Sequence, residues 1–385
     1  MGIIVQKYGG SSVADVEKLE RVAEKVVAAK RDGDDVVVVV SAMGKSTDQL
    51  LALAKQIDPN PPRRELDMLL TTGERVSMAL LAMAIQKRGF EAISFTGSQS
   101  GIITNDRHFD ARIIEVKPHR IEDELARGKI VIVAGYQGMS YRREITTLGR
   151  GGSDTTAIAL AAALNATRAE IYSDVDGVYS ADPRVVPNAE HIATLGYDTM
   201  QEMAEVGAKV LNAAAVEFAK ARGIAIHARS TFAPGRESIV TATGGSEQSV
   251  VGQKGVCRLQ AKSVEAFAFA AQTLGSAAVP MRDVQMSGAL GTMTLATSLT
   301  PDWSAIREFL VARPDIALDE NLASASVVGL DAVGLGGVLE VAQELNVSVN
   351  AMSANALRVS LVVSELRVDE LVRALHARFV GEENA

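Results

Sequence analysis

Five consecutive valines, Val36–Val40, constrain the fold of this chain more than any other feature. A strand built only of β-branched apolar residues is stable where both of its faces are covered, as in a parallel sheet between helices. Further strand patterns occur at Gly2–Val5, Ala92–Phe95, Ile130–Ala134, Glu170–Ser173 and Ile224–Ala228. Helical patterns lie between them at Asp15–Lys30, Arg63–Arg88, Pro118–Arg127, Asp154–Leu164 and Gly207–Arg222. This alternation predicts an α/β sandwich around a mainly parallel sheet.

The pattern changes near residue 233. Residues 233–250 are rich in Gly, Ser, Thr and Glu, which is typical of a surface excursion or linker. Beyond them, strands are expected at Gly291–Ala296, Ser324–Val328 and Ala356–Val363, and helices at Trp303–Arg313, Gly336–Leu345 and Val368–Phe379. We therefore predict two domains, residues 1–250 and 251–385, with an α+β internal repeat in the second.

Composition excludes several classes of protein. The 385 residues are 47% hydrophobic and 22% charged, which suits a globular chain and not a disordered one. A net charge of −8 gives no reason to expect a nucleic-acid or anionic-membrane partner. The lone Cys257 cannot form an intrachain disulfide, and the five scattered histidines lack metal-ligand spacing. The apolar runs are too short for a signal peptide or a membrane span, so we expect a cytoplasmic protein.

Two glycine-rich segments have the features of anion-binding loops. Thr147-Leu-Gly-Arg-Gly-Gly-Ser-Asp154 runs into a predicted helix, whose N–H groups and dipole would face an anion beside Arg150. Lys7-Tyr-Gly-Gly-Ser-Ser12 follows the first strand, where Lys7 could neutralise phosphate oxygens. The alternative in each case is structural: a glycine loop capping a helix, or a surface lysine.

Other motifs are weaker or fail. Gly44-Lys45-Ser46 resembles the end of a P-loop, but the pattern needs glycine where Val39 stands. Neither a dinucleotide-binding G-x-G-x-x-G nor a G-x-S-x-G nucleophile motif is present. Thr72–Arg75 is expected at a turn, where Glu74 could hold an ammonium group or simply pair with Arg75. The acid-rich segment 173–184 follows a strand, and carboxylates together with phosphates suggest Mg²⁺.

Taken in order, these segments resemble the aspartate kinase family of the amino acid kinase superfamily. The matching motifs are Lys7–Ser12, Ser41–Asp48, Leu70–Ser77, Ser94–Gln99, Gly135–Gly138, Thr147–Asp154, Tyr172–Pro187 and Gly207–Leu211. The resemblance covers residues 1–232 and implies a three-layer αβα sandwich. It also implies that ATP phosphorylates the β-carboxylate of L-aspartate to give 4-phospho-L-aspartate, the first step of lysine, threonine and methionine biosynthesis.

The resemblance assigns roles to individual residues. Lys7 would stabilise the transferring phosphoryl group, and Asp154 would orient Lys7. Arg150 would bind a substrate carboxylate and Glu74 the α-ammonium group, while Ser41 and Thr47 would help seat the amino acid. Residues lining the nucleotide site would be Lys7, Gly9, Gly10, Ser173, Asp174, Tyr179, Arg184 and Lys209. Mg²⁺ would be carried by the ATP phosphates, with no ligand set from protein side chains.

The C-terminal region resembles the family's paired ACT domains, which are βαββαβ units that bind amino-acid effectors and dimerise. Two degenerate repeats are expected, the first of them truncated. The segment from Val256 to Ser263 lacks the family's effector loop of aspartate, proline and glycine. We therefore expect a homodimer or higher homo-oligomer with weak or altered inhibition by lysine and threonine. Asn212-Ala-Ala214, near Lys209, is a second departure from the family pattern.

Two other functions stay open at this point. A related kinase could act on another amino acid or a carbamate, although Ser41–Asp48 and Glu74 suit an amino-acid head group. A catalytically inactive amino-acid sensor is the alternative from a different class. Loss of Lys7, Arg150 or Asp154 would indicate such a sensor, and all three residues are present.

Overall fold

The structure is a computed structural model that describes residues 2–149, 151–233, 235–297, 300 and 302–381. It separates into two compact units. The first unit comprises residues 1–178, 191–204 and 209–245, and the second comprises residues 179–190, 205–208 and 246–385. The functional division at residue 250 stays a prediction, and each unit is described by itself.

An eight-stranded sheet forms the centre of the first unit. Its strand order is β12 (Thr194–Gly196), β14 (Glu237–Thr241), β13 (Ile226–Ser230), β9 (Arg168–Ser173), β1 (Ile3–Tyr8), β2 (Asp35–Val40), β6 (Ile130–Ala134) and β3 (Ala92–Phe95). Neighbouring strands pair in parallel, except for the antiparallel pair of β13 and β14. The predicted mainly parallel sheet is confirmed, and the carboxyl ends of β1, β2, β6 and β9 meet at one edge.

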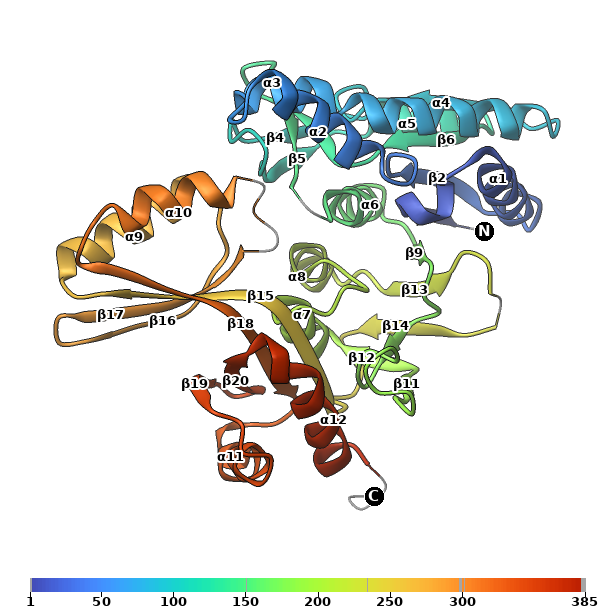
Figure 1. Cartoon of the computed structure of the whole chain (residues 1–385). Helices are drawn as coiled ribbons and strands as arrows, with labels where there is room; N and C mark the ends of the chain where they lie inside the picture. The colour runs from blue at the N-terminus through green and yellow to red at the C-terminus, as the bar shows by residue number, and fades with distance from the viewer. Residues whose placement is uncertain (1, 150, 234, 298–299, 301, 382–385) are drawn as a thin grey trace. The chain divides into compact units, whose positions relative to one another are not determined.

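Helices cover both faces of this sheet, which makes three layers (Figure 1). On one face, α1 (Val16–Arg31) and α4 (Thr72–Gln86) pack on even-numbered valines of β2. On the other face lies α6 (Gly152–Ala163), with α8 (Ala213–Arg222) beside it. All five valines of β2 are fully buried. The valine run therefore lies where its composition requires, between two helical layers.

Smaller elements complete the first unit. They are α2 (Ser46–Ile57), α3 (Arg63–Leu70), α5 (His119–Ala126) and α7 (Tyr197–Glu205), and a four-stranded sheet in the order β5 (Ile113–Val116), β4 (Ile102–Thr104), β7 (Gln137–Ser140), β8 (Ile145–Thr147). The short strands β10 (Val178–Tyr179) and β11 (His191–Ile192) pair with each other. Residues 63–86 are long and apolar enough to span a membrane, but 56% of their apolar stretch is buried inside the protein, as in a core helix.

Several expected elements need correction. The helical region predicted at Arg63–Arg88 is two helices that meet at Thr71, so the turn expected at Thr72–Arg75 lies at Thr71 and Glu74 lies in the first turn of α4. The helix predicted from Gly207 begins at Ala213, because the side chain of Asn212 accepts hydrogen bonds from the first backbone N–H groups and caps it there. The segment predicted as a surface excursion or linker contains β14 and the start of β15 (Ser249–Ala261), and the boundary between the two units, at residues 245 and 246, falls inside it.

The second unit is built on a six-stranded antiparallel sheet. The order is β16 (Met281–Ser287), β17 (Leu290–Ala296), β15, β18 (Ile316–Val328), β20 (Arg358–Ser364) and β19 (Val349–Ala354). Helices α9 (Val264–Ser276) and α10 (Trp303–Val311) enclose one apolar core, and α11 (Leu335–Glu344) and α12 (Val368–Phe379) enclose another. Two α+β modules thus share the long strands β15 and β18, which agrees with an ACT-like region. The predicted truncation of the first repeat relative to the family stays a prediction.

Candidate functional site

The carboxyl edge of the parallel sheet holds a nearly buried ion pair. Lys7 lies near the end of β1, and its Nζ is 2.7 Å from Oδ1 of Asp154 in the first turn of α6. The two side chains are only 12% and 10% exposed. Because little water screens this pair, Asp154 fixes the direction of the Lys7 ammonium group. The helix N-terminus adds a field that favours an anion at the same place.

Backbone segments approach one another closely beside this pair. The N–H of Gly9 donates to the carbonyl of Tyr172 at 3.1 Å, which joins the end of β1 to β9. A Cβ on Gly10 would lie 2.9 Å from the carbonyl oxygen of Ala42, so a side chain there would push β1 and β2 apart. Gly151, which precedes α6, has a φ of +71° that favours glycine. These glycines allow a compact edge where a phosphate chain can meet the backbone.

Glu74 is the second ionisable group at this edge. Its Oε1 accepts a hydrogen bond from the backbone N–H of Ala42 at 3.1 Å, just beyond β2. Its Oε2 is buried and has no hydrogen-bond partner among the described residues. Burial raises the pKa of the Glu74 carboxyl to about 7. An acceptor oxygen left without a donor in this way suits a cationic ligand.

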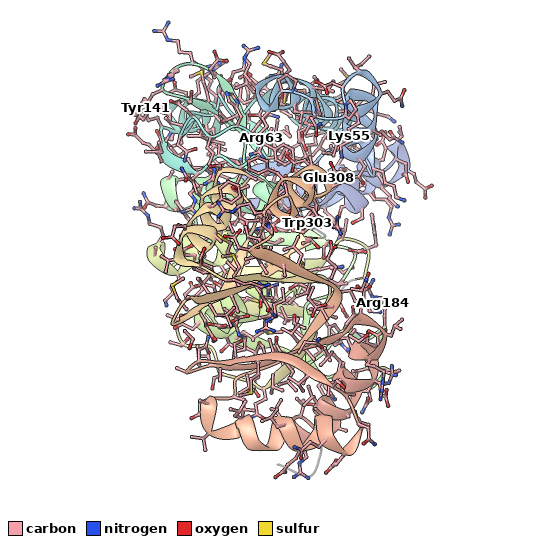
Figure 2. All side chains as sticks on the ribbon, turned by 60° about the vertical axis from the view of Figure 1, so that its left-hand side comes forward. Lys55, Arg63, Tyr141, Arg184, Trp303 and Glu308 are labelled. Carbon is pink, nitrogen blue, oxygen red and sulfur yellow. The ribbon has the colours of Figure 1, made fainter. Side chains whose placement is uncertain are left out.

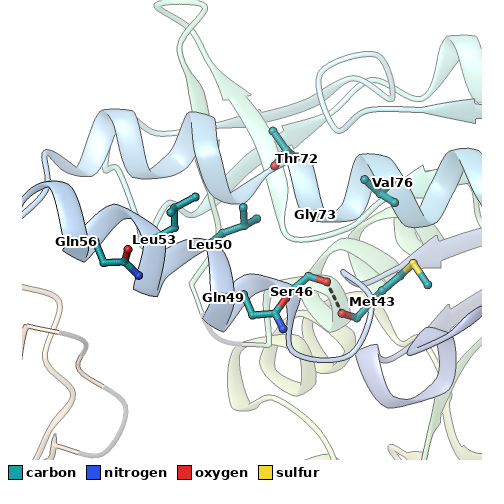
Figure 3. Close-up of a pocket in the computed structure, with 9 residues that line it drawn as sticks. All are labelled: Met43, Ser46, Gln49, Leu50, Leu53, Gln56, Thr72, Gly73 and Val76. Atoms are coloured by element: carbon teal, nitrogen blue, oxygen red, sulfur yellow. Dashed lines mark hydrogen bonds between the residues drawn. The ribbon is translucent and has the colours of Figure 1, made fainter.

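Ser41 and Thr47 lie on the segment that connects β2 to α2. The backbone N–H of Ser41 donates to the carbonyl of Tyr8 at 3.1 Å, and Thr47 lies in the first turn of α2. A cavity of about 450 Å³ lies between α2 and α4, and Figure 3 shows the residues that line it. Its lining residues are Met43, Ser46, Gln49, Leu50, Leu53, Gln56, Thr72, Gly73 and Val76. None of them is a predicted site residue, so this mainly apolar pocket is a neighbour of the site and not its centre.

The predicted nucleotide residues are spread over both units. Ser173 ends β9, and its hydroxyl accepts a hydrogen bond from the N–H of Val175 at 3.2 Å. Asp174 and Lys209 are exposed in the first unit. Tyr179 and Arg184 belong to the second unit, where Arg184 is paired with Asp182 and is visible at the molecular edge in Figure 2. Arg150 lies outside the described residues.

A buried polar network supports the sheet on the face opposite Lys7. Glu170 accepts hydrogen bonds from Gln6 at 2.9 Å and from Arg168 and Arg229 at 2.8 Å. Burial opposes its ionisation, but the hydrogen bond from Arg168 and the charge of Arg229 hold the pKa of Glu170 below its usual value. The rings of Tyr8 and Tyr172 stack at 4.7 Å between centroids. This network fixes the relative register of β1, β9 and β13 behind the site.

Sequence reasoning missed a further carboxylate next to the glycine loop. Asp67 on α3 is fully buried, and it accepts hydrogen bonds from Thr147 at 2.6 Å and from Nδ1 of His108 at 2.7 Å. Burial raises the pKa of the Asp67 carboxyl, although these hydrogen bonds oppose the shift. A signal was available in the sequence: Asp67 stands between Leu66 and Leu70 on the apolar stripe of a short amphipathic helix.

Metal ligands do not gather in the part of the chain that the structure describes. It contains no group of three or more His, Cys, Asp or Glu side chains that could hold an ion. Mg²⁺ does not require such a group, because it usually keeps several waters and binds one or two carboxylates together with substrate phosphates. Asp154 and Asp174 are carboxylates of this kind at the carboxyl edge of the sheet.

Comparisons with known proteins identify the family of this chain. The model of the amino acid kinase family matches residues 2–230. The chain is 42% identical over 407 residues to an aspartokinase of Mycolicibacterium smegmatis, covering 98% of this chain and 96% of that protein. It is also 42% identical over 414 residues to an aspartokinase of Corynebacterium glutamicum, covering 100% and 98%.

A solved structure of similar fold is E. coli aspartokinase III in complex with aspartate and ADP in the R-state. Its TM-score is 0.85 at 24% identity, and the match covers 98% of this chain and 100% of that chain. The sequence relatives extend over both units, so the likeness is not confined to the parallel sheet. The chain therefore belongs to the amino acid kinase family and, within it, to the aspartokinases.

Proposed function

We propose that this chain transfers the γ-phosphoryl group of ATP to the β-carboxylate of L-aspartate, giving ADP and 4-phospho-L-aspartate. The observation that carries the proposal is Glu74, a buried carboxylate whose Oε2 lacks a partner among the described residues. Glu74 bonds Ala42, whose carbonyl in turn approaches Gly10 at the end of the strand that carries Lys7. A binding group for ammonium thus lies at the same sheet edge as a binding group for phosphate.

The mechanism needs positioning and charge stabilisation but no general base. The β-carboxylate of aspartate is already a nucleophile: one of its oxygens forms a bond to the γ-phosphorus as the bond to the leaving ADP oxygen breaks. Lys7, held by Asp154, stabilises the negative charge on the transferring group. Glu74 binds the α-ammonium, Arg150 the α-carboxylate, and Ser41 and Thr47 seat the amino acid. The β-carboxylate then faces ATP.

The nucleotide is held by groups at the ends of β1 and β9. Gly9 and Gly10 admit the phosphate chain, and Ser173, Asp174, Tyr179, Arg184 and Lys209 are the proposed contacts of the rest of the nucleotide. When Mg²⁺ is bound to the ATP phosphates, it neutralises part of their negative charge. The enzyme is proposed to work in the cytoplasm at the first step of the synthesis of lysine, threonine and methionine.

The proposal is tested by supplying ATP and Mg²⁺ with different acceptors and trapping acyl phosphate with hydroxylamine. Aspartate should give hydroxamate in proportion to ADP, whereas glutamate and carbamate should give little. Hydroxamate from an analogue but not from aspartate would favour a related kinase. ATP binding without any transfer would favour a sensor.

Residues 251–385 are proposed to form the regulatory and dimerisation region, with weak or altered feedback control. The support is the ACT-like architecture of the second unit, together with the absence of an effector-loop motif between Val256 and Ser263. Lysine and threonine, alone or together, should inhibit poorly in the same assay. Strong inhibition below millimolar effector would contradict this. Sedimentation should show a homodimer or a higher homo-oligomer.

A further inference from the structure

One buried carboxylate in the first unit is not used by the proposed chemistry. Asp67 on α3 is fully buried, where an ionised group is costly unless its oxygens are hydrogen-bonded. Its Oδ1 accepts from the Thr147 hydroxyl at 2.6 Å and from the Phe109 N–H at 3.1 Å, and its Oδ2 accepts from His108 at 2.7 Å. Three donors from two separate segments thus converge on a single side chain.

Asp67 holds two segments beside the glycine loop: the end of β8, which leads directly into the loop, and the irregular segment at His108 and Phe109. Phe109 has a φ of +73°, a conformation that non-glycine residues rarely adopt, so its segment needs outside support. The same segment also binds Thr147 directly, because the N–H of Ala111 donates to the Thr147 carbonyl at 2.8 Å. A Cβ at Gly149 would lie 3.0 Å from Oδ1 of Asp110, which shows how closely the loop lies against this segment.

Asp67 also connects α3 to the strand that precedes the glycine loop. Thr147 is the last residue of β8 and lies three positions before Arg150. On the other side, α3 continues through Thr71 into α4, whose first turn carries Glu74. The Asp67–Thr147 hydrogen bond therefore joins the helix pair that carries Glu74 to the segment that leads, in the sequence, to Arg150. No comparable contact in the described residues joins Asp67 to Lys7 or to Ser173.

We propose that Asp67 is a positioning residue that sets the spacing between Glu74 and the glycine loop, with His108 and Thr147 as its partners, and thereby determines affinity for the amino acid rather than for ATP. This inference rests on the proposed function, since it assumes that Glu74 and Arg150 bind the two ends of the same substrate. Disturbing Asp67 changes the distance between these ends. No hydrogen bond described for Asp67 reaches the phosphate-binding groups at the ends of β1 and β9, so we expect the affinity for ATP to change less.

The test removes a single hydroxyl. Thr147→Val keeps the size of the side chain and deletes the hydrogen bond to Asp67, and Thr147→Ser restores the hydroxyl. A hydrogen bond to a charged group contributes enough that its loss should raise KM for aspartate about tenfold. KM for ATP should change less than about twofold, and Thr147→Ser should return KM for aspartate close to that of the wild type.

The preceding residue supplies a matched control. Thr146 is as fully buried as Thr147 and lies on the same strand, but its hydroxyl pairs with that of Thr104 at 2.6 Å and not with Asp67. Thr146→Val therefore deletes an equivalent buried hydrogen bond and should leave both KM values near those of the wild type. An equal rise in KM for aspartate in Thr146→Val and Thr147→Val would show a general packing effect and would overturn the inference.

A second readout does not depend on turnover. Backbone hydrogen exchange of the full chain should be faster at residues 148–153 in Thr147→Val than in Thr146→Val. If the wild type fails to phosphorylate aspartate, the proposed function fails, while the exchange measurement still decides the role of Asp67. If the wild type is active but Thr147→Val has the wild-type KM for aspartate and the wild-type exchange rates, Asp67 is only a structural residue and the inference is wrong.

Discussion

The two units of this chain place their charged groups differently. In the first, parallel strands bring their carboxyl ends to one edge, and the nearly buried Lys7, Glu74 and Asp154 lie there. In the second, antiparallel strands distribute their ends over both edges of the sheet, and the outermost strands β16 and β19 are largely exposed. A parallel sheet thus concentrates polar groups for chemistry, whereas an antiparallel sheet with open edges suits association with other chains.

The largest effect is expected at Lys7. Lys7→Ala removes the cation proposed to stabilise the transferring phosphoryl group, so kcat should fall about a thousandfold in a steady-state assay of ADP formation. Lys30→Ala is the matched control, because Lys30 forms an ion pair of the same 2.7 Å length with Asp35 away from the site. Near-normal kcat for a folded Lys7→Ala, judged by circular dichroism, would remove this residue from the catalytic set.

Glu74 should give the enzyme a dependence on pH near neutrality. Its pKa of about 7 means that the carboxylate needed for the ammonium group is lost as the pH falls. In the wild type, kcat/KM for aspartate should drop about tenfold between pH 8 and pH 6. Glu74→Gln should have a low kcat/KM with a flat profile over this range. A Glu74→Gln profile that keeps the wild-type slope would assign the titration to another group.

The same shift has an opposite consequence for stability. Because the pKa of Glu74 is higher in the folded protein than in the unfolded chain, its contribution to stability is complete below its ordinary pKa and is lost as the pH rises through about 7. Glu74→Gln should therefore melt no lower than the wild type at pH 8. The exposed Glu65→Gln on α3 is a control expected to change neither activity nor melting.

His376 should affect the second unit without affecting chemistry. Its Nε2 lies 2.8 Å from the Ser180 hydroxyl, and burial lowers the pKa of the imidazole. A histidine whose pKa is lower in the folded protein than in the unfolded chain contributes stability at pH values above its ordinary pKa, and this contribution is lost as the pH falls. The wild type should therefore melt at a lower temperature at pH 5.5 than at pH 7.5, and His376→Gln should reduce this difference while kcat stays unchanged. The exposed His119→Gln should not reduce it.

The smallest effect is expected at Cys257. Burial raises the pKa of its thiol to about 12, so almost no thiolate forms at neutral pH. A disulfide reagent should leave the native enzyme unmodified and fully active, and should react with one thiol per chain after unfolding. Rapid modification of the native protein would show that the core around β15 opens more readily than its packing indicates.

Strong apolar patterns were sufficient to predict much of the fold. Val36–Val40, Ala92–Phe95 and Ile130–Ala134 are strands as expected. A short run of apolar residues indicates a buried strand by itself, without knowledge of contacts to residues far away in the sequence. α2 was not predicted, although Leu50, Leu53 and Ile57 recur at helical spacing, and none of its residues is buried. The four-stranded sheet was missed as well, because its strands are three or four residues long and are defined by their pairing.

The site was predictable where loops carry recognisable motifs. The motifs identified Lys7 and Asp154, but their 2.7 Å contact depends on how α6 crosses β1. Asp67 was missed because its partners are 41 and 80 residues away in the sequence. The roles of Arg150, Tyr179, Arg184 and the other predicted site residues stay predictions.

The most direct measurement is to determine which carboxylate of aspartate is phosphorylated. If Glu74 and Arg150 hold the α-groups, the β-carboxylate alone faces ATP. Borohydride added to a reaction with ATP, Mg²⁺ and L-aspartate reduces an acyl phosphate to the alcohol. Phosphorylation of the β-carboxylate predicts homoserine, formed from the β-acyl phosphate. The isomer 3-amino-4-hydroxybutanoate, or no alcohol at all while ADP accumulates, would contradict it.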